Sequence, residues 1–173
     1  MRARLQSWTP SEFLRLHNPE AGLQLIKCNA YSGMLALDAR IPTLAHIAEV
    51  YGEGTVMTWL KCQLDSVDVI LGANALGEHA RHDACRLIFA KYKDINVGNL
   101  LHFFAKYKLG EYMEQVAYVG CVEKILLALR LYILNRNDDV ARIERNRGVE
   151  RAWAERQQWE RKAISYDEYI KGK

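Results

Sequence analysis

The chain has 173 residues, of which 50% are hydrophobic and 26% charged, and its formal net charge is +3. This composition suffices for one buried core, and its charge is too small to indicate a nucleic-acid or acidic-membrane partner by itself. The hydrophobic runs stay well short of the roughly 20 residues of a membrane span, and the N-terminal segment lacks the apolar stretch of a secretory signal. The sequence therefore predicts a cytoplasmic protein.

Helix starts near the N-terminus are marked by the three prolines, Pro10, Pro19 and Pro42. Proline at the first helical position loses no hydrogen bond, and Thr9 with Glu12 has the spacing of a capping box. Two short N-terminal helices and a third that begins at Pro42 are therefore predicted. Residues 28–40 show no sustained hydrophobic period, and a loop or an irregular turn is expected there.

Apolar residues then recur every three or four positions in three segments, residues 55–71, 76–92 and 97–107. This period is typical of helices that bury one face against a core. Asn96 is a candidate N-cap of the third helix, and Gly72 is a candidate stop of the first.

The next segment, residues 121–134, is apolar around most of its helical circumference. A helix of this kind is expected to be surrounded by other helices. We therefore expect it at the centre of the bundle, with Leu126 and Leu129 almost fully buried.

Beyond Leu134 the composition changes abruptly, because 14 of the 27 residues from Arg136 to Lys162 are charged and the two signs alternate. Opposite charges four residues apart predict a solvated helix, in which Gly148 is the residue most able to cause a break. The predicted fold is all-α: a compact multi-helix bundle over residues 1–135, followed by a highly charged helical extension over residues 136–173.

The last residues regain apolar and aromatic side chains behind Ser165, which has capping-box spacing with Glu168. A helix that docks into a groove of a partner needs a few apolar anchors at helical spacing. The predicted partner-docking motif consists of Ile164, Tyr166, Tyr169 and Ile170.

The four cysteines are widely spaced and include no CxxC pair; they are Cys28, Cys62, Cys85 and Cys121. Three lie within apolar stretches, so the sequence predicts reduced thiols in the core rather than a disulfide framework.

Catalytic and metal motifs are weak. The chain has no P-loop, no GxGxxG and no GxSxG, and His102 is expected on a helix surface or as a hydrogen-bonded core histidine. The nearest approach to a metal site is the segment EHARHDAC, which holds Glu78, His79, His82, Asp83 and Cys85. Because it offers neither HExxH nor paired CxxC, we interpret these as outer-face residues and predict no metal, no cofactor and no catalytic residue.

The middle of the chain is its basic part. Residues 81–108 hold two acidic residues and six basic ones, Arg81, Arg86, Lys91, Lys93, Lys106 and Lys108. Lysines near helix C-termini are explained by the helix dipole and by snorkelling. Alternatively, these cations contact phosphates while Tyr92 and Tyr107 stack on unpaired bases.

The second half of the chain also carries a family resemblance, in the segment LLHFFAKYKLGEYMEQVAYVG, the helix that ends LYILNRN, and the final ISYDEY. This pattern, over residues 42–173, resembles a group of small uncharacterised helical proteins from Bacteroidota genomes and their mobile elements. In that group a Leu-Ser helix start precedes the paired phenylalanines, whereas this chain has Asn96-Val97-Gly98-Asn99. The resemblance implies a helical fold and supplies no activity and no catalytic residues.

Two functions follow as hypotheses. The first is a non-enzymatic helical adaptor, an accessory protein of a mobile element or phage, whose extension presents the docking motif to an unidentified protein. The alternative is a nucleic-acid-binding accessory factor in DNA replication or transfer, which uses residues 81–108 on single- or double-stranded nucleic acid. The short helical body with a charged tail is similar in architecture to phage helicase loaders.

Overall fold

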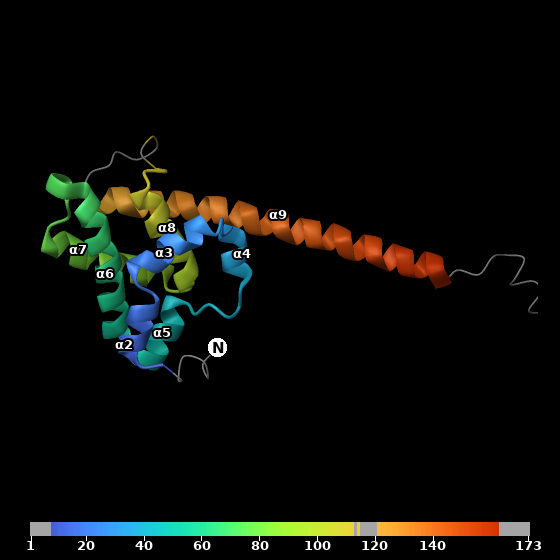
Figure 1. The fold of residues 1–173 in the computed structure, drawn as a ribbon, viewed down its shortest axis with the longest axis horizontal. Coiled ribbons are helices and arrows are strands. Elements are labelled where there is room, and N and C mark those ends of the chain that lie inside the picture. Colours follow the sequence, from blue (N-terminus) through green and yellow to red (C-terminus); the bar gives the residue numbers. More distant parts are fainter. Residues whose placement is uncertain (1–7, 113, 115–120, 163–173) are drawn as a thin grey trace, which may run out of the picture. The chain divides into compact units, whose positions relative to one another are not determined.

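The computed structural model describes residues 8–112, 114 and 121–162 (Figure 1). Its helices are α2 (Pro10–Leu16), α3 (Pro19–Lys27), α4 (Ser32–Leu37), α5 (Leu44–Tyr51), α6 (Glu53–Leu71), the 3-10 turn η1 (Gly72–Asn74), α7 (Glu78–Tyr92), α8 (Val97–Lys108) and α9 (Val122–Lys162). The described residues contain no strand, only an isolated bridge between Thr43 and Asn96. The predicted all-α class is confirmed. None of these helices combines the length and the apolarity that a bilayer span requires.

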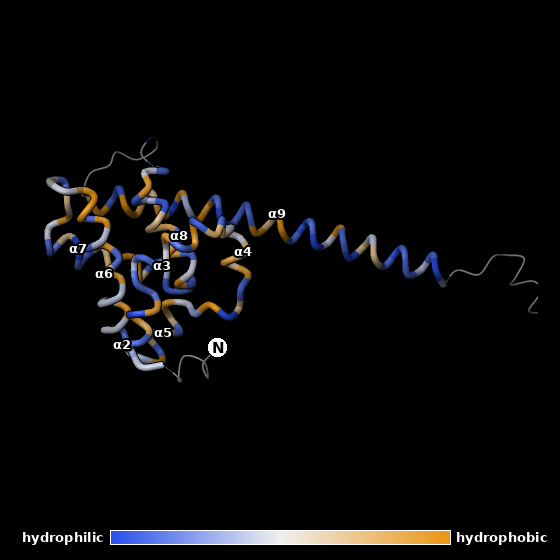
Figure 2. Tube along the Cα trace, viewed as in Figure 1, coloured by the Kyte–Doolittle hydropathy of each residue, from blue (hydrophilic) through white to orange (hydrophobic). Residues whose placement is uncertain are grey.

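The chain divides into two compact units, residues 1–140 and residues 141–173, which we call the body and the extension. Helix α9 contributes to both and continues through Gly148, so the break considered there does not occur. Figure 2 shows that hydrophilic residues predominate along the C-terminal half of α9.

The N-terminal helix starts follow the predicted cap chemistry. The Thr9 hydroxyl accepts a hydrogen bond from the Glu12 N–H, and the Glu12 carboxylate accepts one from the Thr9 N–H at 2.7 Å, which confirms the capping box. Helix α5 begins at Leu44 with Thr43 as its N-cap, so Pro42 precedes the helix rather than opening it. The loop expected over residues 28–40 is also partly wrong, because α4 lies within it.

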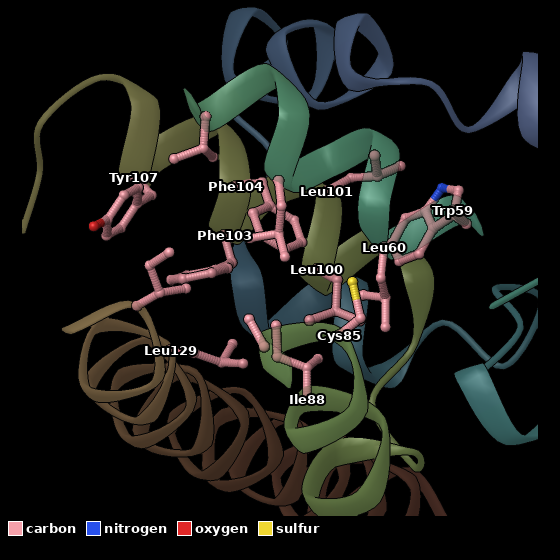
Figure 3. Close-up of a cluster of buried hydrophobic side chains, with 14 of the residues drawn as sticks. Trp59, Leu60, Cys85, Ile88, Leu100, Leu101, Phe103, Phe104, Tyr107 and Leu129 are labelled. Carbon is pink, nitrogen blue, oxygen red and sulfur yellow. The ribbon is translucent and has the colours of Figure 1, made fainter. Parts of the chain in front are cut away.

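The centre of the body is α8. Every residue from Val97 to Ala105 is buried, as is Tyr107, and α8 contacts α3, α4 and α6. Its aromatic side chains meet residues of α6, α7 and α9 in the cluster of Figure 3. The predicted N-cap is confirmed, since the Asn96 side chain accepts a hydrogen bond from the Asn99 N–H at 2.8 Å.

The first part of α9 is not the central helix that its composition predicted. Its buried residues form a single stripe, Ile125, Ala128, Leu129 and Tyr132. Leu127 is 40% exposed and Leu134 51% exposed, while Leu126 is only partly buried, so the expectation for Leu126 is wrong. Single exposed leucines are common on protein surfaces, and here they made a surface helix resemble an enclosed one.

The cysteines are free thiols, but most of them lie outside the core. Cys28 and Cys62 are exposed, Cys121 is half-buried, and Cys85 alone of the four is buried. The prediction of core thiols therefore holds for Cys85 only.

We predict that Leu129→Ala lowers the free energy of unfolding by about 2 to 5 kcal/mol, because the fully buried side chain leaves a cavity. Its matched control is Leu127→Ala on the exposed side of the same helix, with an expected loss under about 1 kcal/mol. Arg151→Ala, in the solvated extension, should change stability by about 0 to 1 kcal/mol. Denaturant titrations measure all three, and equal losses for Leu129→Ala and Leu127→Ala would contradict the assignment of the α9 stripe.

A close approach of α3 to α8 generates the second prediction. A Cβ added at Gly22 would lie 2.6 Å from the Leu101 carbonyl oxygen, whereas one added at Gly54 would meet nothing within 4 Å. We expect Gly22→Ala to destabilise by about 1 to 3 kcal/mol, since backbone must move. Gly54→Ala should keep or raise stability, by at most about 1 kcal/mol. The reverse order of unfolding midpoints would contradict this packing.

Candidate functional site

The body holds two adjoining polar cavities, which are lined by residues of α3, α4, α8 and α9 and of the turns after α3 and α8. One has a volume of about 530 Å³ and the other about 330 Å³. Both are lined by the same four polar residues, Ser32, Lys106, Glu111 and Asp139. These residues are therefore the wall between the two cavities.

Two asparagines, the α8 N-cap Asn96 and Asn99 within α8, position α4 at this wall. The Asn96 amide donates to the Leu35 carbonyl at 2.7 Å, and the Asn99 amide donates to the Ser32 carbonyl at 3.0 Å. The Ser32 hydroxyl in turn donates to an Asp139 carboxylate oxygen at 2.7 Å. A chain of hydrogen bonds thus joins α8, α4 and the body part of α9.

His102 lines the larger cavity and is 3% exposed. Its Nδ1 is hydrogen-bonded to the Tyr132 hydroxyl at 3.1 Å. Burial lowers the pKa of His102 to about 4, with Lys106 acting in the same direction and Glu111 and Asp139 opposing. The imidazole is therefore neutral at pH 7, which agrees with the prediction of a hydrogen-bonded core histidine.

The wall shared by the two cavities carries an ion pair between Lys106 Nζ and Glu111 Oε2 at 2.7 Å. Tyr112 lines the smaller cavity, and burial raises the pKa of its phenol. Ser32 donates to a carboxylate while His102 bonds a phenol, so these two do not form the hydrogen-bonded nucleophile and base of covalent catalysis. The absence of catalytic residues stays a prediction.

The predicted metal segment lies at the start of α7. Among the described residues there is no group of three or more His, Cys, Asp or Glu side chains placed to hold one ion. Glu78, His79, His82 and Asp83 are exposed. Cys85 is buried, and burial raises the pKa of its thiol to about 11.

Three of the six basic residues predicted to contact nucleic acid interact within the body. Arg81 bridges Asp65 and Asp68 with contacts of 2.8 Å each, and its side chain is only 21% exposed. Lys106 pairs with Glu111, and Lys108 donates to the Ser66 hydroxyl at 3.3 Å while burial lowers its pKa.

The other three basic residues, Arg86, Lys91 and Lys93, are exposed on or next to α7. The Lys91 ammonium lies 5.5 Å from the centroid of the Tyr92 ring. Tyr107 is 1% exposed, so the hypothesis that it stacks on bases is wrong. The structure therefore does not assemble the six cations and two tyrosines into one surface.

The predicted docking motif, Ile164, Tyr166, Tyr169 and Ile170, lies outside the described residues. The described part of the extension carries a different apolar set that the sequence analysis did not identify. Val149 is 70% exposed, Trp153 63% and Trp159 75%. The presence of two tryptophans in a charged helical segment could have indicated this apolar set, because helix geometry gives the side of the helix on which each residue lies.

Comparison of the chain with family models, with curated proteins and with solved structures finds no match. The function is therefore argued from the cavities and from the exposed residues of α9.

The buried histidine generates a pH prediction. Unfolded histidine takes up a proton near pH 6.5, whereas folded His102 resists protonation down to about pH 4, so acid favours the unfolded chain. The contribution of neutral, buried His102 to the free energy of unfolding is complete above pH 6.5 and is lost as the pH falls toward 4. The expected loss from this residue is about 3 kcal/mol.

Denaturant titrations across this pH range compare the wild type with His102→Gln, and the variant should show the flatter dependence. His17, whose pKa burial also lowers, is present in both proteins and cancels in the difference. Parallel pH profiles would show that His102 does not titrate as described.

Proposed function

We propose that the protein is a non-enzymatic helical adaptor that acts in the cytoplasm and binds a protein partner through α9. The observation that carries the proposal is the exposure of Val149, Trp153 and Trp159 on one helix. Tryptophan is among the residues that dominate the energy of protein interfaces. The four free cysteines agree with a reducing compartment.

These apolar residues share one side of the helix. At about 100° per residue, Val149, Ala152, Trp153 and Trp159 fall within an arc of about 120°. Apolar anchors at this spacing suit docking into a groove, the same recognition mode that the predicted C-terminal motif would use. We call this set the tryptophan face.

The charges near the tryptophan face indicate what kind of groove would fit. Within residues 141–162, the same arc holds Arg142, Arg145 and Arg156 together with one acid, Glu160, and Arg142 also has an interaction within the structure. Complementary charge favours a partner groove that is apolar along its floor and acidic along its rim.

The nucleic-acid alternative has less support. Arg81, Lys106 and Lys108 interact within the body, which leaves three exposed cations in the segment that was expected to contact phosphates. A basic surface of that size supplies few of the contacts from which non-specific nucleic-acid affinity is built.

The test compares the wild type with the double variant Trp153→Ala/Trp159→Ala in affinity enrichment, followed by titration of the purified partner. We expect binding to weaken by at least about 30-fold, because each removed indole is an interface anchor. The tryptophan emission of the wild type should shift to shorter wavelength on binding, because both indoles leave water.

The matched control is Arg151→Ala/Glu155→Ala, which changes the same helix away from the tryptophan face. It should bind like the wild type, and a chain truncated after Arg161 tests the predicted C-terminal motif separately. Equal binding by the tryptophan variant and the wild type would refute the role of this face. An emission shift with an oligonucleotide that disappears at raised salt would favour the nucleic-acid alternative instead.

A further inference from the structure

We propose that the paired cavities of the body bind a neutral polyhydroxylated ring compound, the chemistry of a sugar. This inference concerns α3, α4, α8 and the body part of α9, and it does not depend on the adaptor function. Volumes of about 530 and 330 Å³ lie in the range of small-molecule sites.

The charges at the wall favour an uncharged ligand. Lys106 is paired with Glu111, and Asp139 accepts a hydrogen bond from Ser32 and has a further interaction within the structure. His102 is neutral at pH 7. A charged ligand would have to break these pairs, whereas a hydroxyl group could add to them.

The side chains that line the cavities include both hydrogen-bond acceptors and hydrogen-bond donors that can bind a ligand. An ionised carboxylate has about four lone-pair sites, so Glu111 and Asp139 retain acceptor capacity beyond their present partners. The side-chain amides of Asn29 and Asn135 line the cavities and make no hydrogen bond with the described residues. Sugar hydroxyls both donate and accept, so they match this mixture better than a group that only donates or only accepts.

An aromatic side chain stands beside these polar groups. Tyr31 lines the larger cavity, is 61% exposed, and makes no capping bond at the start of α4. Asn29, with a left-handed φ of 49°, forms the turn that places Tyr31 there. An exposed ring next to carboxylates and amides offers a platform for the C–H face of a sugar.

The test measures binding of the full chain to glucose, galactose, mannose, N-acetylglucosamine and ribose by saturation-transfer NMR and calorimetry. Glucosamine and glucuronate are matched charged rings. We expect at least one neutral sugar to bind, and to bind more tightly than either charged ring. No binding by any neutral sugar, or tighter binding of a charged ring, would overturn the proposal.

Tyr31→Ala locates the site. Because this side chain is exposed, its loss should leave folding intact and weaken sugar binding by about tenfold. Met34→Ala is the matched control, since Met34 is 51% exposed on α4 and does not line either cavity. Binding that is unchanged in Tyr31→Ala would place the sugar elsewhere and overturn the proposal.

Discussion

The burial of α8 on all sides constrains the rest of the body. A helix in that position leaves little of its polar side chains to water, and α8 carries Asn99 at 0% exposure and His102 at 3%. Each must find a partner within the protein, because an unpaired buried polar group costs about 1 to 3 kcal/mol. The Asn99 side-chain NH2 group donates to the Ser32 carbonyl, while its buried Oδ1 has no hydrogen-bond partner among the described residues, and His102 bonds the Tyr132 hydroxyl. These two bonds specify where α4 and α9 meet α8, and the cavities lie at that junction.

The sequence predicted the helices better than their places in the bundle. Capping chemistry and a period of three to four residues depend on neighbours along the chain, so Thr9, Asn96 and Gly72 could be assigned correctly. Which helix lies in the centre depends on partners far away in sequence. Polar Asn99 and His102 made α8 resemble a helix that buries only one face, while Leu127 and Leu134 made α9 resemble an enclosed helix.

The same distinction explains how much of the candidate sites could be predicted. The sequence shows that Lys106 and Arg81 are basic, but it does not show which carboxylates they pair with. The partner of Lys106 lies in the turn after α8, and that of Arg81 is brought close by the packing of α6 against α7. The wall residues Ser32 and Asp139 are 107 positions apart and carry no motif. The tryptophan face, by contrast, is a local property of one helix, and its residues could have been grouped from the sequence by helix geometry alone.

Aromatic residues have opposite roles in the two units. Phe103 and Tyr107 are almost fully buried, so their apolar surface contributes to the free energy of folding, and each also contacts the Tyr112 ring. Trp153 and Trp159 keep most of their surface in water, so burial stabilises neither. Opposite charges four residues apart, such as Arg151 and Glu155, have the spacing that stabilises an exposed helix by about 0.2 to 0.5 kcal/mol per pair. Large indoles at such positions therefore add little to the stability of the chain, and their surface stays available to a partner that removes it from water.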